Sequence, residues 1–146
     1  MSRTFHYTKG LHLSAIIAAG EILPARAYIG RGERPVVWFS LNPEWEATVW
    51  PGKAREELAV TLPLGICRIE VDEATAPYTW DRLRFLAKIH PAVADALEDS
   101  ARKYGADPCE WRGTFWPVPR EKWVAIETWV PGEGWLPNGT PTDKAA

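Results

Sequence analysis

The sequence predicts an α+β domain with a mixed or antiparallel β-sheet. Apolar, β-branched and aromatic runs typical of strands occur near the start, in the middle and near the end of the chain. Segments with helical spacing are confined to the N-terminal part and the middle, so strands and helices do not alternate as a parallel sheet requires. With 146 residues, of which 46% are hydrophobic, the chain is expected to bury its core as one domain, residues 1–146.

The first predicted elements are a strand at residues 4–8 and a short helix after it. Apolar positions from Leu13 onward recur at the spacing of one helical face. Gly20 is expected to end this helix, because glycine readily adopts the left-handed conformation of a C-cap, and Pro24 follows. The stretch 25–35 has no periodicity and is expected to be a loop.

A buried strand is predicted at residues 36–40, where the sequence reads VVWFS. Asn42 and Pro43 then have the pattern of a helix N-cap and first helical position. A short helix is therefore predicted at about residues 43–49.

A second strand is predicted at residues 66–71, where apolar and charged residues alternate. Cys67, Ile69 and Val71 would face one side, and the charged residues between them would face the other. Cys67 is thus expected in the core rather than at a reactive position.

Two helices are predicted in the middle of the chain. Thr79 can cap the first of them. His90 and Pro91 open the second, which is expected to run to about Tyr104 and to stop at Gly105.

The end of the chain returns to strands, predicted at residues 113–116 and 121–130. Alternation along 121–130 places Val124 and Ile126 on an apolar face and Trp123 on the opposite one. Residues 131–146 are rich in glycine and proline and are expected to form a partly ordered tail. Six strand residues are predicted to belong to the core: Val37, Phe39, Cys67, Ile69, Val124 and Ile126.

Charge and composition limit the classes of function that the sequence supports. Seventeen basic and 19 acidic residues give a net charge of −2, with no long basic run, so tight charge-driven binding to a phosphate backbone is not expected. Cys67 and Cys109 lie far apart without a CxxC pattern, which indicates neither a zinc site nor a disulfide framework. No leader or membrane-spanning run is recognisable, so we expect a soluble, cytoplasmic protein without a membrane partner.

Motifs of several common enzyme classes do not occur in the sequence. It contains no GxSxG, HExxH, GxxxxGK[ST] or GxGxxG pattern, so serine hydrolase, zincin, P-loop and Rossmann functions have no support. No metal site is expected. The nine tryptophans are expected mostly in the core or at its rim.

Three strands each present polar groups beside aromatics on one face. His6 and Thr8 share a face of the first strand, and Trp38 and Ser40 share a face of the second. Glu121 opens the last strand. We expect these side chains to line one cleft.

In their order along the chain, these motifs resemble the ADP-ribosyltransferase superfamily. The nearer likeness is to its diphtheria-toxin-like branch, which includes poly-ADP-ribose polymerase catalytic domains and toxin-type transferases. His6-Tyr7-Thr8, Trp38-Phe39-Ser40 and Glu121 stand where such families have a histidine motif, an aromatic strand and a late glutamate. The likeness covers about residues 4–50 and 113–130.

The resemblance implies mixed or antiparallel sheets forming a cleft, and NAD as the substrate. His6 would hold a hydroxyl of the nicotinamide-side ribose, and the backbone of Tyr7 would bind the nicotinamide amide. Trp38 would stack on the nicotinamide ring, with Thr8 and Ser40 completing the NAD-binding set. Nicotinamide would be released and ADP-ribose transferred to an unidentified protein or nucleic-acid acceptor.

The resemblance gives the catalytic role to Glu121 together with His6. Glu121 would orient the ribose and stabilise positive charge as the glycosidic bond breaks. Glu127, on the same face by alternation, is the alternative acidic residue. His6 as a structural residue and Glu121 as part of a solvated charge run are the corresponding non-catalytic interpretations.

A second function is consistent with the same residues. The chain would then be a non-catalytic, tryptophan-lined module that binds a nucleotide, a glycan or a protein. The sequence leaves both functions, the acceptor and the oligomeric state open.

Overall fold

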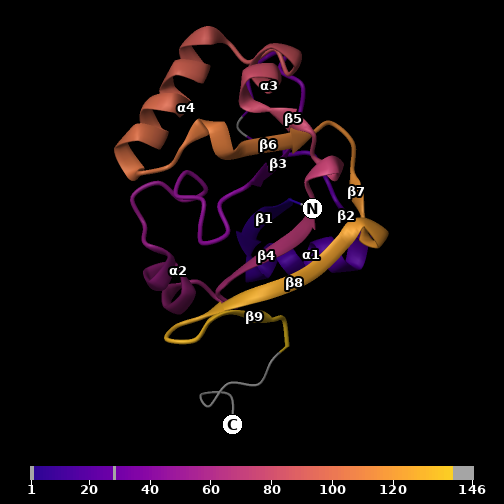
Figure 1. Cartoon of the computed structure of the whole chain (residues 1–146), viewed down its shortest axis with the longest axis vertical. Coiled ribbons are helices and arrows are strands. Elements are labelled where there is room, and N and C mark those ends of the chain that lie inside the picture. Colours follow the sequence, from indigo (N-terminus) through magenta and orange to yellow (C-terminus); the bar gives the residue numbers. More distant parts are fainter. Residues whose placement is uncertain (1, 28, 140–146) are drawn as a thin grey trace.

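A computed structural model describes residues 2–27 and 29–139, and its centre is a seven-stranded antiparallel sheet (Figure 1). Its strands lie, from one edge to the other, in the order β5 (Tyr78–Thr79), β6 (Trp111–Thr114), β3 (Val37–Ser40), β1 (Arg3–Lys9), β4 (Ile66–Asp72), β8 (Trp123–Val130) and β9 (Gly134–Pro137). A small second sheet pairs β2 (Glu21–Ile22) with β7 (Val118–Pro119). The predicted α+β class with an antiparallel sheet is confirmed.

The α-helices of the described residues are α1 (Gly10–Ala19), α2 (Arg55–Thr61), α3 (Trp80–Leu86) and α4 (Pro91–Tyr104). In Figure 1, α3 and α4 lie at the β5–β6 end of the sheet, whereas α1 packs against β1 and β4. None of these helices has the length and hydropathy needed to cross a bilayer.

The two helices with glycine stop signals end where the sequence predicted. Gly20 adopts φ 74°, and its amide bonds the carbonyls of Ile16 and Ile17 at 2.9 and 3.2 Å. Gly105 ends α4 in the same way with φ 80°. At both positions the positive φ favours glycine because a side chain would meet the following carbonyl.

The helix predicted at 43–49 is wrong, because these residues form a loop. Its cap does form: the Asn42 side chain accepts the amides of Glu44 and Trp45 at 2.9 and 3.4 Å. An Asx turn therefore begins here without continuing into a helix.

Side chains of the sheet explain why the turn does not continue. The Tyr7 hydroxyl donates to the carbonyl of residue 42, and the Arg68 guanidinium donates to that of residue 43. The indole N–H of Trp135 donates to the carbonyl of residue 44 at 3.0 Å. A helix would direct these carbonyls along its axis to amides four residues ahead. Tertiary contacts direct them toward the sheet instead.

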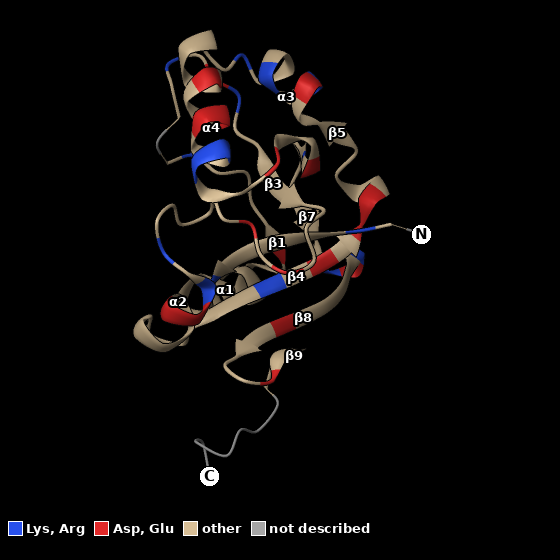
Figure 2. Cartoon of the chain, turned by 60° about the vertical axis from the view of Figure 1, so that its left-hand side comes forward, with Lys and Arg blue, Asp and Glu red and all other residues tan. Residues whose placement is uncertain are grey.

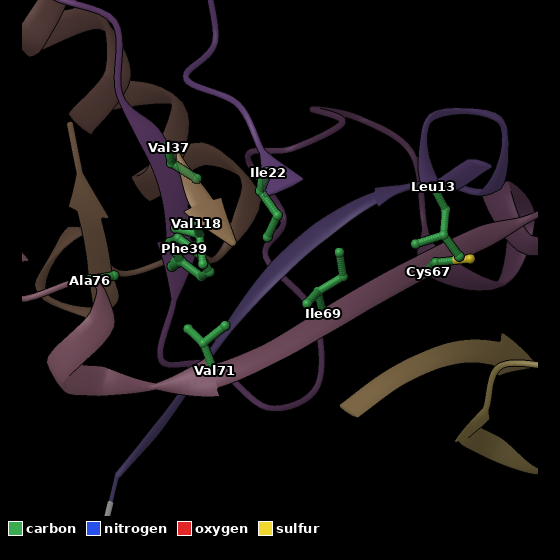
Figure 3. Packing of buried hydrophobic residues seen from close by; sticks show 9 residues of the cluster. All are labelled: Leu13, Ile22, Val37, Phe39, Cys67, Ile69, Val71, Ala76 and Val118. Atoms are coloured by element: carbon green, nitrogen blue, oxygen red, sulfur yellow. The ribbon is translucent and has the colours of Figure 1, made fainter. Parts of the chain in front are cut away.

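One hydrophobic core fills the face of the sheet that α1 covers (Figure 3). It joins Val37 and Phe39 of β3 to Ile69 of β4, each at most 4% exposed. Its remaining buried members are Leu13, Ile22, Cys67, Val71, Ala76 and Val118. Burial of each large apolar side chain contributes about 1.5–3 kcal/mol. The predicted core positions of Val37, Phe39, Cys67 and Ile69 are confirmed.

A second core lies under α3 and α4. Trp80 and Leu83 of α3 pack there with Ala94 of α4 and Trp111 of β6. The Trp80 and Trp111 rings meet edge to face with centroids 5.0 Å apart. Such contacts add about 0.5–1.5 kcal/mol to the area buried.

The prediction that Val124 belongs to the core is wrong, since its side chain is 48% exposed. The register between β4 and β8 shifts at Glu70/Val71, so that Val71 lies opposite Trp123 instead of Val124. A β-bulge of this kind inserts one residue and reverses the alternation beyond it. Trp123 consequently packs against the first core together with Ile126.

The C-terminal segment is more ordered than the sequence suggested. Residues 131–146 were expected to form a partly ordered tail, but residues 134–137 pair with β8 as strand β9. Residues 140–146 lie outside the described part of the chain. Strands β2, β5 and β7 and helix α2 were not predicted.

Candidate functional site

A cavity of about 340 Å³ lies where β1, β3 and the 41–54 loop meet. Four residues expected in the NAD-binding set line it: His6, Tyr7, Trp38 and Ser40. Its size is at the lower end of the roughly 300–1,000 Å³ typical of small-molecule pockets. It can therefore enclose one ring system with an attached sugar rather than a whole dinucleotide.

The cavity forms where β1 and β3 separate. These strands share one paired position among the described residues, Phe5 opposite Ser40, and Figure 3 shows them diverging. Two side chains of β1 bond the β3 backbone in place of ladder amides. Thr4 Oγ1 donates to the Ser40 carbonyl at 3.0 Å, and His6 Nδ1 bonds the Trp38 carbonyl at 2.8 Å.

The hydrogen bond between His6 Nδ1 and the Trp38 carbonyl defines the tautomer of His6. A carbonyl only accepts, so Nδ1 must carry the proton and Nε2 is left as an acceptor. Burial lowers the pKa of His6, although its hydrogen bond to Trp38 opposes the effect. At neutral pH the ring is therefore uncharged.

The register shows that His6 and Trp38 belong to opposite faces of the sheet. Phe5 and Ser40 are opposite each other and share a face, which Trp38 and Tyr7 also share by alternation. His6 instead lies toward Phe39, with ring centroids 5.6 Å apart. Both reach the cavity because it opens at the seam between the strands.

Tyr7 and Ser40 are tied into the cavity wall by hydrogen bonds. The Tyr7 hydroxyl donates to the Asn42 carbonyl, and burial raises the pKa of Tyr7 well above its usual value. Ser40 Oγ donates to Glu46 Oε1 at 3.0 Å and accepts the Asn42 amide at 3.1 Å. These contacts hold the 41–54 loop against the strands.

Glu46 is a buried carboxylate in the cavity wall, 6% exposed, and the sequence analysis did not find it. Its second oxygen accepts the Thr48 amide at 3.2 Å and the Thr48 hydroxyl. No Lys, Arg or His of residues 2–27 and 29–139 forms an ion pair with it. Both of its carboxylate oxygens are therefore satisfied by hydrogen bonds from Ser40 and Thr48.

Trp111 forms another wall of the cavity and is 6% exposed. Its indole N–H is buried and meets no acceptor within the described part of the chain. An unpaired buried donor costs about 1–3 kcal/mol. Because the nitrogen itself is enclosed by protein, Trp111 presents its ring rather than its N–H to the cavity.

Glu110 is a second carboxylate beside the cavity. It precedes Trp111, its carbonyl accepts the Leu41 amide at 2.9 Å, and its side chain is half-buried. Burial and the nearby charges of Asp107 and Glu46 raise its pKa, against a hydrogen bond from Asn42. Glu110 was not among the residues singled out from the sequence, because no motif includes it.

The other predicted site residues lie outside the cavity lining. Thr8 is buried opposite Cys67 in the β1–β4 ladder. Glu121 lies in an exposed 3₁₀ turn, Arg120–Lys122, that precedes β8, rather than in the strand itself. Glu127 forms an ion pair with Arg68 at 2.9 Å.

No group of three His, Cys, Asp or Glu side chains within the described residues is arranged to hold a metal ion. Cys67 is 1% exposed, and burial raises the pKa of its thiol, as expected for a core cysteine.

Comparison with known proteins identifies no relative: no protein-family model, no curated protein and no solved structure matches this chain.

Proposed function

We propose that the cavity binds the nicotinamide-ribose half of NAD and that the protein is an ADP-ribosyltransferase. One observation carries this proposal: His6, Tyr7, Trp38 and Ser40 line the same cavity although they come from segments more than 30 positions apart. The divergence of β1 and β3 supports the cleft expected of that fold.

Each wall suits one part of this ligand. Trp38 and Trp111 offer flat apolar surfaces for a planar ring. The neutral His6 accepts a ribose hydroxyl at Nε2. Glu46 supplies a negative charge beside a pyridinium ring.

The reaction breaks the bond between the ribose C1′ and the nicotinamide nitrogen. Nicotinamide leaves with the bonding electron pair, the acceptor nucleophile bonds C1′, and the acceptor loses a proton. Positive charge on the ribose grows in the transition state, so a nearby carboxylate accelerates the step. We assign this role to Glu46 and Glu110 in preference to Glu121, because these two lie in or beside the cavity.

The test is incubation with NAD labelled on its adenylate half, with and without a cell lysate. Release of nicotinamide together with label on protein or nucleic acid is expected. Glu46→Gln or Glu110→Gln should lower turnover by about 10² or more with little change in NAD affinity, while Glu133→Gln in the β8–β9 turn should have no effect. If only Glu121→Gln loses turnover, Glu121 rather than Glu46 or Glu110 stabilises the positive charge on the ribose.

The position of Glu121 also favours a second candidate, a non-catalytic binding module. In that case the protein binds NAD or ADP-ribose in the same cavity and releases no nicotinamide. Failure of calorimetry to detect either ligand would exclude both functions.

A further inference from the structure

The surface around the C-terminal end of α3 combines exposed aromatic rings with unpaired cations. We call it the α3 surface and define it by Arg34, Arg82, Phe85, Lys88 and Trp116. Phe85 is 75% exposed and Trp116 is 67% exposed, more than any other aromatic side chain among the described residues. Isolated exposed apolar residues are common, but two such rings beside several cations are not explained by packing.

Contacts connect the 25–35 loop, residues 115–116 and the chain just after α3. The Arg34 guanidinium lies 3.8 Å from the centre of the Phe115 ring and 5.6 Å from that of Trp116. The Arg34 amide bonds the Ala87 carbonyl at 2.8 Å, which joins the 25–35 loop to the residues just after Phe85.

The same surface continues along α3. Arg82 lies 5.4 Å from the Tyr78 ring centre, and Tyr78 contacts Phe115 at 5.4 Å between centroids. Figure 2 shows blue segments on α3 and on the loops beside it.

The cations of the α3 surface are available to an external anion. Arg34, Arg82 and Lys88 are exposed, and none forms an ion pair with a carboxylate of the described residues. Arg84, by contrast, is paired with Glu98 at 3.0 Å.

Carboxylates in the same segments reduce this positive charge without cancelling it. Glu98 is paired with Arg84, whereas Glu33, which accepts the Gly30 amide at 3.1 Å, and Asp81 at the start of α3 form no ion pair within the described residues. Three unpaired cations against these two carboxylates leave the α3 surface with a small excess of positive charge, although the whole chain has a net charge of −2.

We propose that the α3 surface binds single-stranded nucleic acid. Unpaired bases stack on exposed aromatic rings, and the neighbouring cations contact the phosphates between them. An acidic peptide would use the cations but not the ring faces, and a duplex keeps its bases stacked and inaccessible. Three cations give a modest electrostatic contribution, which agrees with the absence of any long basic run.

Fluorescence anisotropy with a fluorescein-labelled 15-nucleotide thymidine strand tests the proposal, in about 50 mM salt and without NAD. The strand should bind, whereas a duplex of equal length should bind much more weakly. A peptide of 15 glutamates should not displace the strand. Because NAD is absent, this result is independent of the proposed transferase activity, and either proposal can fail alone.

Two variants remove the stacking rings and should fold, because both rings are exposed. Trp116→Ala and Phe85→Ala should each weaken binding of the strand about tenfold. Lys88→Asn, a substitution suited to the φ of 57° at this position, should reduce the slope of log K against log salt by about 1.

A matched control lies at the other end of α4. Lys103 is a cation over the Tyr104 ring, 5.4 Å from its centre, in the last turn of this 14-residue helix and so about 20 Å from the α3–α4 junction. Lys103→Gln should leave binding unchanged. Three results would each overturn the proposal. Lys103→Gln and Trp116→Ala could weaken binding of the strand equally, or the glutamate peptide could displace the strand. The third is the absence of binding at a 100-fold excess of protein over about 1 μM strand.

Discussion

His6 connects two strands where their backbones no longer pair. Its Nδ1–H bonds the Trp38 carbonyl, and the imidazole fills part of the seam beside Phe39. A structural role and a ligand-binding role for His6 are therefore compatible. Nδ1 holds the two strands together, and Nε2 has no hydrogen-bond partner among the described residues. A substitution at this position acts on stability as well as on binding.

The lowered pKa of His6 predicts a pH dependence of stability. Protonation is easier in the unfolded chain, where the pKa is about 6.5, so the folded state loses stability as pH falls below that value toward the folded pKa. His6→Asn keeps a donor for the Trp38 carbonyl but does not titrate. Urea unfolding at pH 7.5, 6.5 and 5.5 should show the wild type losing stability relative to the variant. Parallel profiles of the two proteins would contradict the prediction.

Gly10 marks the start of α1 for a steric reason. Its amide bonds the Gly65 carbonyl at 2.9 Å, and a Cβ at this position would overlap the backbone of Leu64. Gly10→Ala should lower the free energy of unfolding by about 1–3 kcal/mol, because the backbone of residue 64 must move. Gly30→Ala, whose Cβ would meet nothing within 4 Å, serves as the control in the same denaturation experiment.

At the scale of elements, local signals predicted the helices that end at Gly20 and Gly105 and failed where tertiary contacts dominate. The cap at Asn42 was recognised, but the donors that hold the following carbonyls come from β1, β4 and β9, far away in sequence. The bulge opposite Glu70 likewise leaves no mark in the pattern of 121–130. Both errors have the same physical origin, since a contact distant in sequence overrides a local preference.

The bulge gives opposite expectations for two apolar strand residues. Phe39 is 4% exposed in the first core, so Phe39→Ala should cost about 3–5 kcal/mol. Val124 is 48% exposed, and Val124→Ala should change stability by less than about 0.5 kcal/mol. Chemical denaturation measures both values. A large loss at Val124 would mean that β8 does not carry the bulge.

At the scale of the whole molecule, part of the candidate site could be predicted from the sequence. The short motifs around His6 and Trp38 identified two strands that do meet at the cavity. Glu46 and Trp111 were not predicted, because Glu46 lies in a segment that was expected to be a helix and Trp111 precedes the strand expected at 113–116, whose neighbour β3 is known only from the sheet order. Glu121 was assigned as the first residue of the predicted strand 121–130, but it lies in the 3₁₀ turn that precedes β8, and the sequence pattern does not determine the direction of that turn.

The two cores are joined through β3 and the residue before it. Val36 belongs to the second core, and the adjacent Val37 belongs to the first, because successive side chains of a strand point to opposite faces. Neither core can lose its packing without displacing the strand that the other requires. We therefore expect a single cooperative unfolding transition.

Hydrogen exchange followed by mass spectrometry in increasing urea tests this cooperativity. Amides of α4, over the second core, and of β4, in the sheet beside the first, should lose protection at the same urea concentration. Phe39→Ala should lower both midpoints equally, although Phe39 contributes to the first core alone. If instead α4 keeps its midpoint while that of β4 falls, the cores unfold separately and β3 does not couple them.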